Sequence, residues 1–189
     1  MNIEDSIIKL GKRLDDWCEQ SLVAVASRHS PGRTEALRDG LDIVTTLNLL
    51  KTQGLATVSK LLNHLNGAAE GERASSLIRA FEFAAKLAAT LNDELLDTDG
   101  YNKVVLCTDE VAEALDAIGS GRAALAVLLD HNDARVRAFA GAYLIELIPE
   151  RVVPILREIE VRTASNSAAS TAHWTLLRWE REGKHSNTT

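Results

Sequence analysis

The chain has 189 residues, and its 27 acidic and 21 basic side chains give a net charge of −6. Hydrophobic residues make up 46%, enough for a buried core in one large or two small domains. The acidic balance argues against a protein that binds a phosphate backbone. Two cysteines are too few for a disulfide scaffold or a structural zinc site. No apolar run approaches the roughly 20 residues that a membrane span requires.

The composition favours helices throughout the chain. Leu and Ala, both strong helix formers, make up more than a quarter of the residues, and no segment of convincing length alternates with a period of two. Apolar residues recur at helical spacing in the first half, where Ser30-Pro31-Gly32 and Gly54 are expected to end helices. The predicted helices of this half cover residues 3–28, 34–53, 55–65 and 72–96.

The second half begins at a break, Asp97-Thr98-Asp99-Gly100, and contains shorter helices. Pro154 is expected to kink one of them or to mark its true start. About nine helices are predicted in all, and those of this half cover residues 101–118, 122–129, 134–147, 150–161 and 168–182. We expect an N-terminal helical domain over 1–96, a second domain over 97–183 and a disordered tail over 184–189.

The run Leu128 to Arg137, followed by Ala140, Leu144 and Leu147, resembles a HEAT repeat. Residues 91–183 are also similar to a small bacterial HEAT-like family of unknown function. That resemblance rests on Leu95-Leu96-Asp97, Asn102-Lys103, the block 125–147 and the closing run 175–180. It implies an α-solenoid, a right-handed stack of antiparallel helix pairs, and brings no catalytic residue with it.

No motif in the sequence indicates catalysis or a cofactor. The chain has no Gly-x-Ser-x-Gly elbow, Walker loop or dinucleotide-binding glycine pattern. His131 lies among Asp130, Asn132 and Asp133, but Asp and Asn are expected to cap a helix there, so no metal is predicted. Cys18 and Cys107 are expected to pack as small apolar residues rather than pair. The acidic start lacks a signal peptide, which predicts a cytoplasmic protein.

The charge is concentrated in residues 93–116, which hold eight acidic side chains and one basic one, a net −7 in 24 residues. Two interpretations remain open: an ordinary solvated helix face, or a docking surface for a basic partner. Aromatic side chains near this segment are candidate anchors, because aromatic residues dominate interface hot spots. The candidate partner-binding residues are Asp97, Asp99, Tyr101, Asp109, Glu110, Glu113, Asp116 and Trp174.

These observations predict a non-catalytic protein-binding module, either monomeric or a weak homo-oligomer. The leading hypothesis is an immunity protein or antitoxin that covers a cognate, often basic, toxin domain. The alternative is a scaffold or regulatory adaptor without a toxin partner. A third hypothesis, an enzyme or a nucleic-acid-processing HEAT protein, is disfavoured because residues 96–189 carry ten basic and fourteen acidic side chains.

Overall fold

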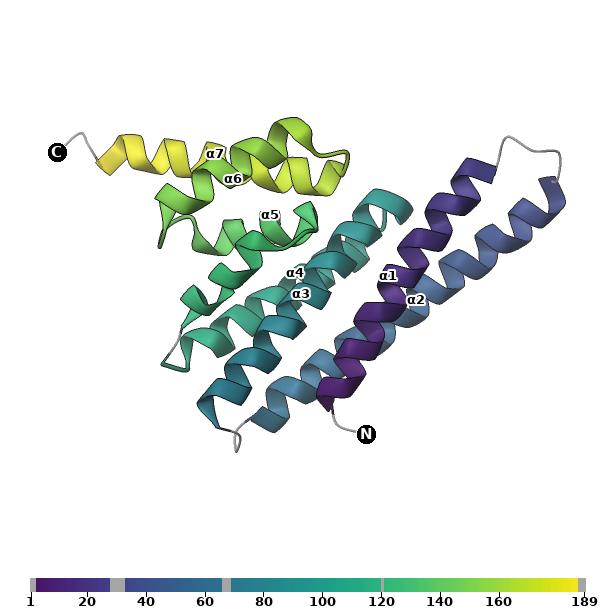
Figure 1. Cartoon of the computed structure of the whole chain (residues 1–189), viewed down its shortest axis with the longest axis horizontal. Helices are drawn as coiled ribbons and strands as arrows, with labels where there is room; N and C mark the ends of the chain where they lie inside the picture. Colours follow the sequence, from purple (N-terminus) through teal and green to yellow (C-terminus); the bar gives the residue numbers. More distant parts are fainter. Residues whose placement is uncertain (1–2, 28–32, 66–68, 120, 187–189) are drawn as a thin grey trace. The chain divides into compact units, whose positions relative to one another are not determined.

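The computed structural model describes residues 3–27, 33–65, 69–119 and 121–186 (Figure 1). Over these residues the fold is all-α, as predicted, with eight helices and no strand. Seven are α-helices and the eighth, η2, is a 3₁₀ helix. They are α1 (Ile3–Ser27), α2 (Arg33–His64), α3 (Glu70–Leu95), α4 (Thr98–Asp116), η2 (Arg122–Asp130), α5 (Ala134–Leu144), α6 (Pro149–Arg162) and α7 (Asn166–Ser186).

The chain divides into two compact units, residues 1–68 and 69–189. In the first, α1 and α2 pack against each other. In the second, α3 packs on α4, and α5, α6 and α7 pack on one another. The boundary predicted after residue 96 therefore falls between α3 and α4, two helices that pack together within the second unit.

The helix break predicted at Gly54 is wrong, because α2 continues through it to His64. Gly54 is buried, and buried residues recur every three or four positions on both sides of it: Leu47, Leu50, Val58, Leu61 and Leu65. A glycine costs about 1 kcal/mol in a helix interior. The uninterrupted apolar stripe gives more than that in packing, so the two predicted helices are one.

Helix α3 is the centre of the second unit. It contacts α4, η2, α5 and α7, and every residue from Ala80 to Leu91 except Glu82 is buried. Its sequence carries two apolar stripes, one with Leu77 and Phe81 and one with Ile78, Ala85 and Ala89, and this pattern predicts a helix enclosed by neighbours. The burial of Phe81 on one stripe and of Ala85 and Ala89 on the other confirms that prediction.

Helix α4 begins at Thr98, three residues before its predicted start. Asp97 caps it by accepting a hydrogen bond from the Gly100 amide at 2.9 Å. The run 97–100 is thus the cap and first turn of the helix rather than a loop. A Cβ on Gly100 would collide with the Asp97 carboxylate, which explains a glycine inside this turn.

Further along, η2 occupies the predicted helix 122–129 but is a 3₁₀ helix, and Asp133 caps α5 as expected. Helix α6 begins at Pro149 and runs through Pro154, which therefore does not mark its start. A Cβ on Gly141 would lie 2.8 Å from Leu156 Cδ2, so α5 approaches α6 closely through this small residue.

Two smaller predictions can be compared with the described residues. Helix α7 extends to Ser186, so residues 184–186 of the predicted tail continue the helix, and 187–189 lie outside the described part. Cys107 is buried and makes no disulfide, whereas the side chain of Cys18 lies outside the description. No described helix is long and apolar enough to span a membrane.

Candidate functional site

The acidic segment 93–116 does not form one continuous exposed surface, because four of its aspartates bind groups of the chain itself. Asp116 accepts hydrogen bonds from the Arg122 amide at 3.0 Å and from Arg122 Nε at 2.8 Å, and forms an ion pair with that guanidinium. These contacts hold the pKa of Asp116 below its usual value, the side-chain hydrogen bond from Arg122 being the largest cause. Asp109 accepts a hydrogen bond from the Tyr143 hydroxyl.

The other two paired aspartates bind groups at the start of a helix. Asp97 caps α4, as described above. Asp93, near the end of α3, accepts hydrogen bonds from the hydroxyls of Ser165 and Ser167, each at 2.6 Å, and from the Ser167 amide at 2.8 Å. These two carboxylates therefore stabilise helix ends, and their internal hydrogen bonds make them less available to a partner.

Four acidic side chains of the segment remain open to solvent: Glu94, Asp99, Glu110 and Glu113. Within the described part of the chain they make no hydrogen bond or ion pair. The last three share the outer face of α4 with Leu106, which is 62% exposed. This face fits both interpretations of the sequence, because it is solvated and also available to a partner.

A groove of about 600 Å³ opens elsewhere on the second unit, between α4, α5 and α7. Its volume is in the range of pockets that hold small ligands or peptide side chains. Each helix contributes residues three or four positions apart, so one face of each helix lines the groove. The lining is Tyr101, Val105 and Asp109 from α4, Phe139, Ala142, Tyr143 and Glu146 from α5 and the turn after it, Thr171, Trp174, Thr175 and Arg178 from α7, and Arg122 from η2.

Two tyrosines mark different parts of the groove. Burial raises the pKa of Tyr101, an effect that the Thr171 side chain on α7 reduces. The Tyr143 hydroxyl donates to Asp109 and lies 3.0 Å from Thr108 Oγ1. Burial, reinforced by Asp109, raises the pKa of Tyr143 further above its usual value. Both phenols are therefore neutral hydrogen-bonding groups at physiological pH.

Trp174 is the largest exposed apolar side chain at the groove, with 61% of its surface accessible. Its ring meets the His173 ring edge to face, with centroids 5.2 Å apart. His173 Nδ1 in turn lies 2.7 Å from Glu160 Oε1 on α6. Leu106 of α4 and Val127 of η2 are exposed to the same extent inside helices, but neither lines the groove, whereas Trp174 does.

The structure thus separates the eight predicted site residues. Tyr101, Asp109 and Trp174 come together at the groove, although 73 residues separate the first from the last. Asp97 and Asp116 are used internally, and Asp99, Glu110 and Glu113 lie outside the groove lining. The predicted site residues did not include three members of this lining, Tyr143, Glu146 and Arg178. The spacing of Thr171, Trp174, Thr175 and Arg178 marks one face of α7, and it is the signal that could have found part of the set.

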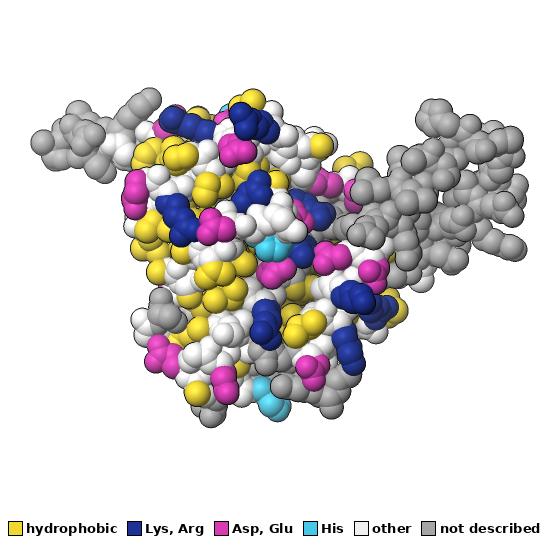
Figure 2. Space-filling model, viewed as in Figure 1, with side chains coloured by type: hydrophobic (Ala, Val, Ile, Leu, Met, Phe, Trp, Pro, Cys, Tyr) yellow, Lys and Arg dark blue, Asp and Glu magenta, His cyan; other side chains and the backbone are white. Residues whose placement is uncertain are grey.

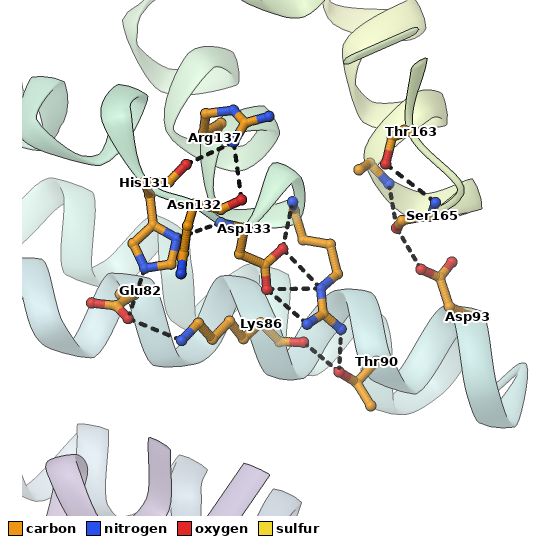
Figure 3. Close-up of polar contacts among 12 residues, drawn as sticks. Glu82, Lys86, Thr90, Asp93, His131, Asn132, Asp133, Arg137, Thr163 and Ser165 are labelled. Carbon is orange, nitrogen blue, oxygen red and sulfur yellow. Dashed lines mark hydrogen bonds and ion pairs between the residues drawn. The ribbon is translucent and has the colours of Figure 1, made fainter. Parts of the chain in front are cut away.

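A second polar cluster, at the turn before α5, resembled a metal site in the sequence and has a different role (Figure 3). The Asp133 amide donates to His131 Nδ1 at 3.0 Å, and His131 Nε2 lies 3.3 Å from Glu82 Oε1. Glu82 also pairs with Lys86 at 3.1 Å. The described residues contain no group of three His, Cys, Asp or Glu side chains able to hold a metal ion. These contacts fasten the turn to α3.

Arg135 completes this cluster. Its Nη2 lies 2.7 Å from Asp133 Oδ2, and its Nη1 donates to Thr90 Oγ1 at 3.1 Å. The side chains of Arg135 and Asp133 are only 21% and 18% exposed, so the pair is largely withdrawn from water. Every charged group here has a partner within the cluster, which leaves none directed at an external ligand.

One face of the chain shows acidic and basic side chains interspersed, with apolar side chains gathered at the left of the view (Figure 2). Among its described residues, no large block of one charge is visible.

No family model matches the chain, and neither a curated protein nor a solved structure matches it. The similarity to HEAT repeats therefore stays a prediction, and the groove is the feature that carries the functional proposal.

Proposed function

We propose that this protein is a non-catalytic binding module whose second unit docks a protein partner at the groove between α4, α5 and α7. The observation that carries the proposal is Trp174, a tryptophan 61% exposed at the edge of a concavity of about 600 Å³. Tryptophan is the residue type most enriched among binding hot spots, and a pocket beside it gives a partner side chain a place to be buried.

The chemistry of the groove supports binding over catalysis. Cys107 lies on α4 outside the groove lining and is buried, and burial, with a smaller contribution from Glu110, raises the pKa of its thiol to about 11. The thiol therefore stays protonated and unreactive at neutral pH. Tyr143 is likewise held neutral, and Arg122 is paired with Asp116. These groups can form fixed hydrogen bonds and charges but not an activated nucleophile.

The open acidic face of α4 fits the same proposal and gives the partner a preferred sign. Asp99, Glu110 and Glu113 lie on the helix that also forms one wall of the groove. Their field would speed the encounter with a basic protein and select against an acidic one. A basic toxin domain, neutralised by an immunity protein or antitoxin, is the partner we put first. A HEAT-like stack of the helix pairs would present the groove along its surface.

The experiment is a binding measurement with the proteins encoded next to this gene. Trp174→Ala should weaken the affinity of the true partner by about 30-fold or more, because a tryptophan anchor contributes on the order of 2 kcal/mol. The matched control is Val161→Ala, a residue 81% exposed at the end of α6 and outside the groove, which should leave the affinity unchanged.

The same experiment separates the immunity hypothesis from the adaptor hypothesis. A partner that is toxic when expressed alone and harmless with this protein supports immunity, whereas a non-toxic partner supports the adaptor. Equal affinity of the wild type and Trp174→Ala for every partner would contradict the groove as the docking site.

A further inference from the structure

We propose that the groove receives a basic side chain, lysine or arginine, of the partner, with its charged head at Asp109 and Glu146 and its alkyl stem along Trp174. This inference rests on the proposed function and specifies its chemistry. Two features of the groove support it: its two carboxylates accept few hydrogen bonds from the described residues, and its charge stays negative once Arg122 is counted with Asp116.

The two carboxylates of the groove are poorly satisfied by the chain itself. Asp109 accepts one hydrogen bond, from the Tyr143 hydroxyl, although a carboxylate has about four acceptor sites. Glu146 is exposed and accepts no hydrogen bond from the described residues. A guanidinium or ammonium group carries several donors and no acceptor, so it complements this pair, whereas a carboxylate ligand would be repelled by it.

The basic residues of the groove do not cancel these acids. Arg122 lines the groove, but its guanidinium is hydrogen-bonded to Asp116. That hydrogen bond and the charge of Asp116 raise the pKa of Arg122, and the charge of Glu146 adds a smaller effect. The remaining side-chain charges are two negative, on Asp109 and Glu146, and one positive, on Arg178. The groove therefore carries a net charge of −1 toward a ligand.

The apolar part of the lining suits the stem of a long basic side chain. Trp174 offers an exposed aromatic ring, and two half-buried residues, Val105 and Ala142, add apolar surface to the lining. Lysine and arginine bury their methylene groups against apolar surface while the charged head reaches polar partners. A cation near an indole ring gains further stabilisation, most often when it is arginine. The volume of about 600 Å³ also leaves room for neighbouring backbone.

The test is an NMR titration of the ¹⁵N-labelled full chain with three uncharged-backbone probes: N-acetylarginine amide, N-acetylnorleucine amide and N-acetylglutamate amide. The arginine probe should shift the Trp174 indole signal and amides of 101–109, 139–146 and 171–178 in a saturable and salt-sensitive way. The norleucine probe should bind at least about fivefold more weakly, and the glutamate probe should cause no saturable shift.

Three variants test which charge the groove prefers in its ligand. The double variant Asp109→Asn with Glu146→Gln should lower the affinity for the arginine probe by about tenfold, because both negative charges are lost. The asparagine at position 109 keeps an acceptor for the Tyr143 hydroxyl, so this hydrogen bond is retained. Arg178→Gln should strengthen it by roughly two- to fivefold, since a like charge is removed. Glu94→Gln, an exposed acid of the same segment outside the groove, is the control and should change nothing.

The inference is overturned if the glutamate probe binds better than the arginine probe, if Arg178→Gln weakens the arginine probe, or if no probe shifts the groove. If any of these results is found but a partner binds the wild type and not Trp174→Ala, the proposed function stands. Only the assignment of a basic side chain to the groove is then contradicted. A partner with the same affinity for the wild type and for Trp174→Ala would contradict the proposed function itself.

Discussion

Two polar regions of the second unit differ in how their charges are satisfied. At the turn before α5, Glu82, Lys86, His131, Asp133 and Arg135 bind one another and α3. At the groove, Asp109 has one hydrogen bond, Glu146 has none from the described residues, and Trp174 stays exposed. The first region uses its charges to hold the fold, and the second leaves some available for a partner.

The largest expected effect is on stability at the turn. Asp133→Ala removes the α5 cap and leaves the largely buried Arg135 without its carboxylate, so the free energy of unfolding should fall by about 2–3 kcal/mol. Urea denaturation measures this change. Glu113→Ala, an exposed site without a partner in the described chain, should stay within about 0.5 kcal/mol. Equal losses of unfolding free energy for the two substitutions would contradict the view that charges at the turn hold the fold.

Acid should weaken the same turn. Burial alone would raise the pKa of Asp133, but the hydrogen bonds and charge of Arg135 outweigh it and hold the pKa below its usual value. The stability that Asp133 contributes is therefore complete above about pH 5 and lost as the pH falls below about 4. Unfolding measured from pH 6 to 3 should show a steeper loss for the wild type than for Asp133→Asn. Parallel curves would show that Arg135 does not favour the charged carboxylate.

A smaller effect is expected where the groove meets the core. Tyr143→Phe removes the hydroxyl that donates to Asp109 and contacts Thr108, while the ring keeps its edge-to-face contact with Phe81, with centroids 5.1 Å apart. The free energy of unfolding should fall by about 1 kcal/mol. Because Asp109 gains acceptor capacity, the affinity for a basic ligand should not decrease. A fall in that affinity would show that the tyrosine orients the carboxylate for binding.

The smallest stability effect should come from Trp174, despite its size. A side chain 61% exposed contributes little to the core, so Trp174→Ala should change the free energy of unfolding by less than about 0.5 kcal/mol. The same substitution is expected to abolish most partner affinity. A destabilisation above about 2 kcal/mol would mean that this ring packs into the fold, and its role as an anchor would then fail.

Local patterns predicted the all-α class and most of the helices. The apolar spacing along α3 predicted its burial on all sides, and the Asp133 cap followed from a short polar run before an apolar stripe. The errors came from residues whose local sequence is compatible with two different structures. Gly54 resembles a helix end but lies in an unbroken apolar stripe, and 97–100 resembles a loop but forms a cap and first turn.

The site was less predictable because it depends on pairs far apart in the sequence. The bond between Asp109 and Tyr143 spans 34 residues, and no local pattern distinguishes Asp109 from the unpaired Glu110 beside it. The acidic segment was visible as a charge excess, but only the fold shows that Asp116 is paired with Arg122, six residues away, and that Trp174 shares a groove with Tyr101.

The most direct test of the groove as the docking site is hydrogen exchange of the chain with and without its bound partner. Amides should become protected in three segments, 101–109 of α4, 139–146 at α5 and 171–178 of α7, and the protection should be absent with Trp174→Ala. Protection confined to α1 and α2, or to α6, with these three segments unchanged would contradict docking at the groove.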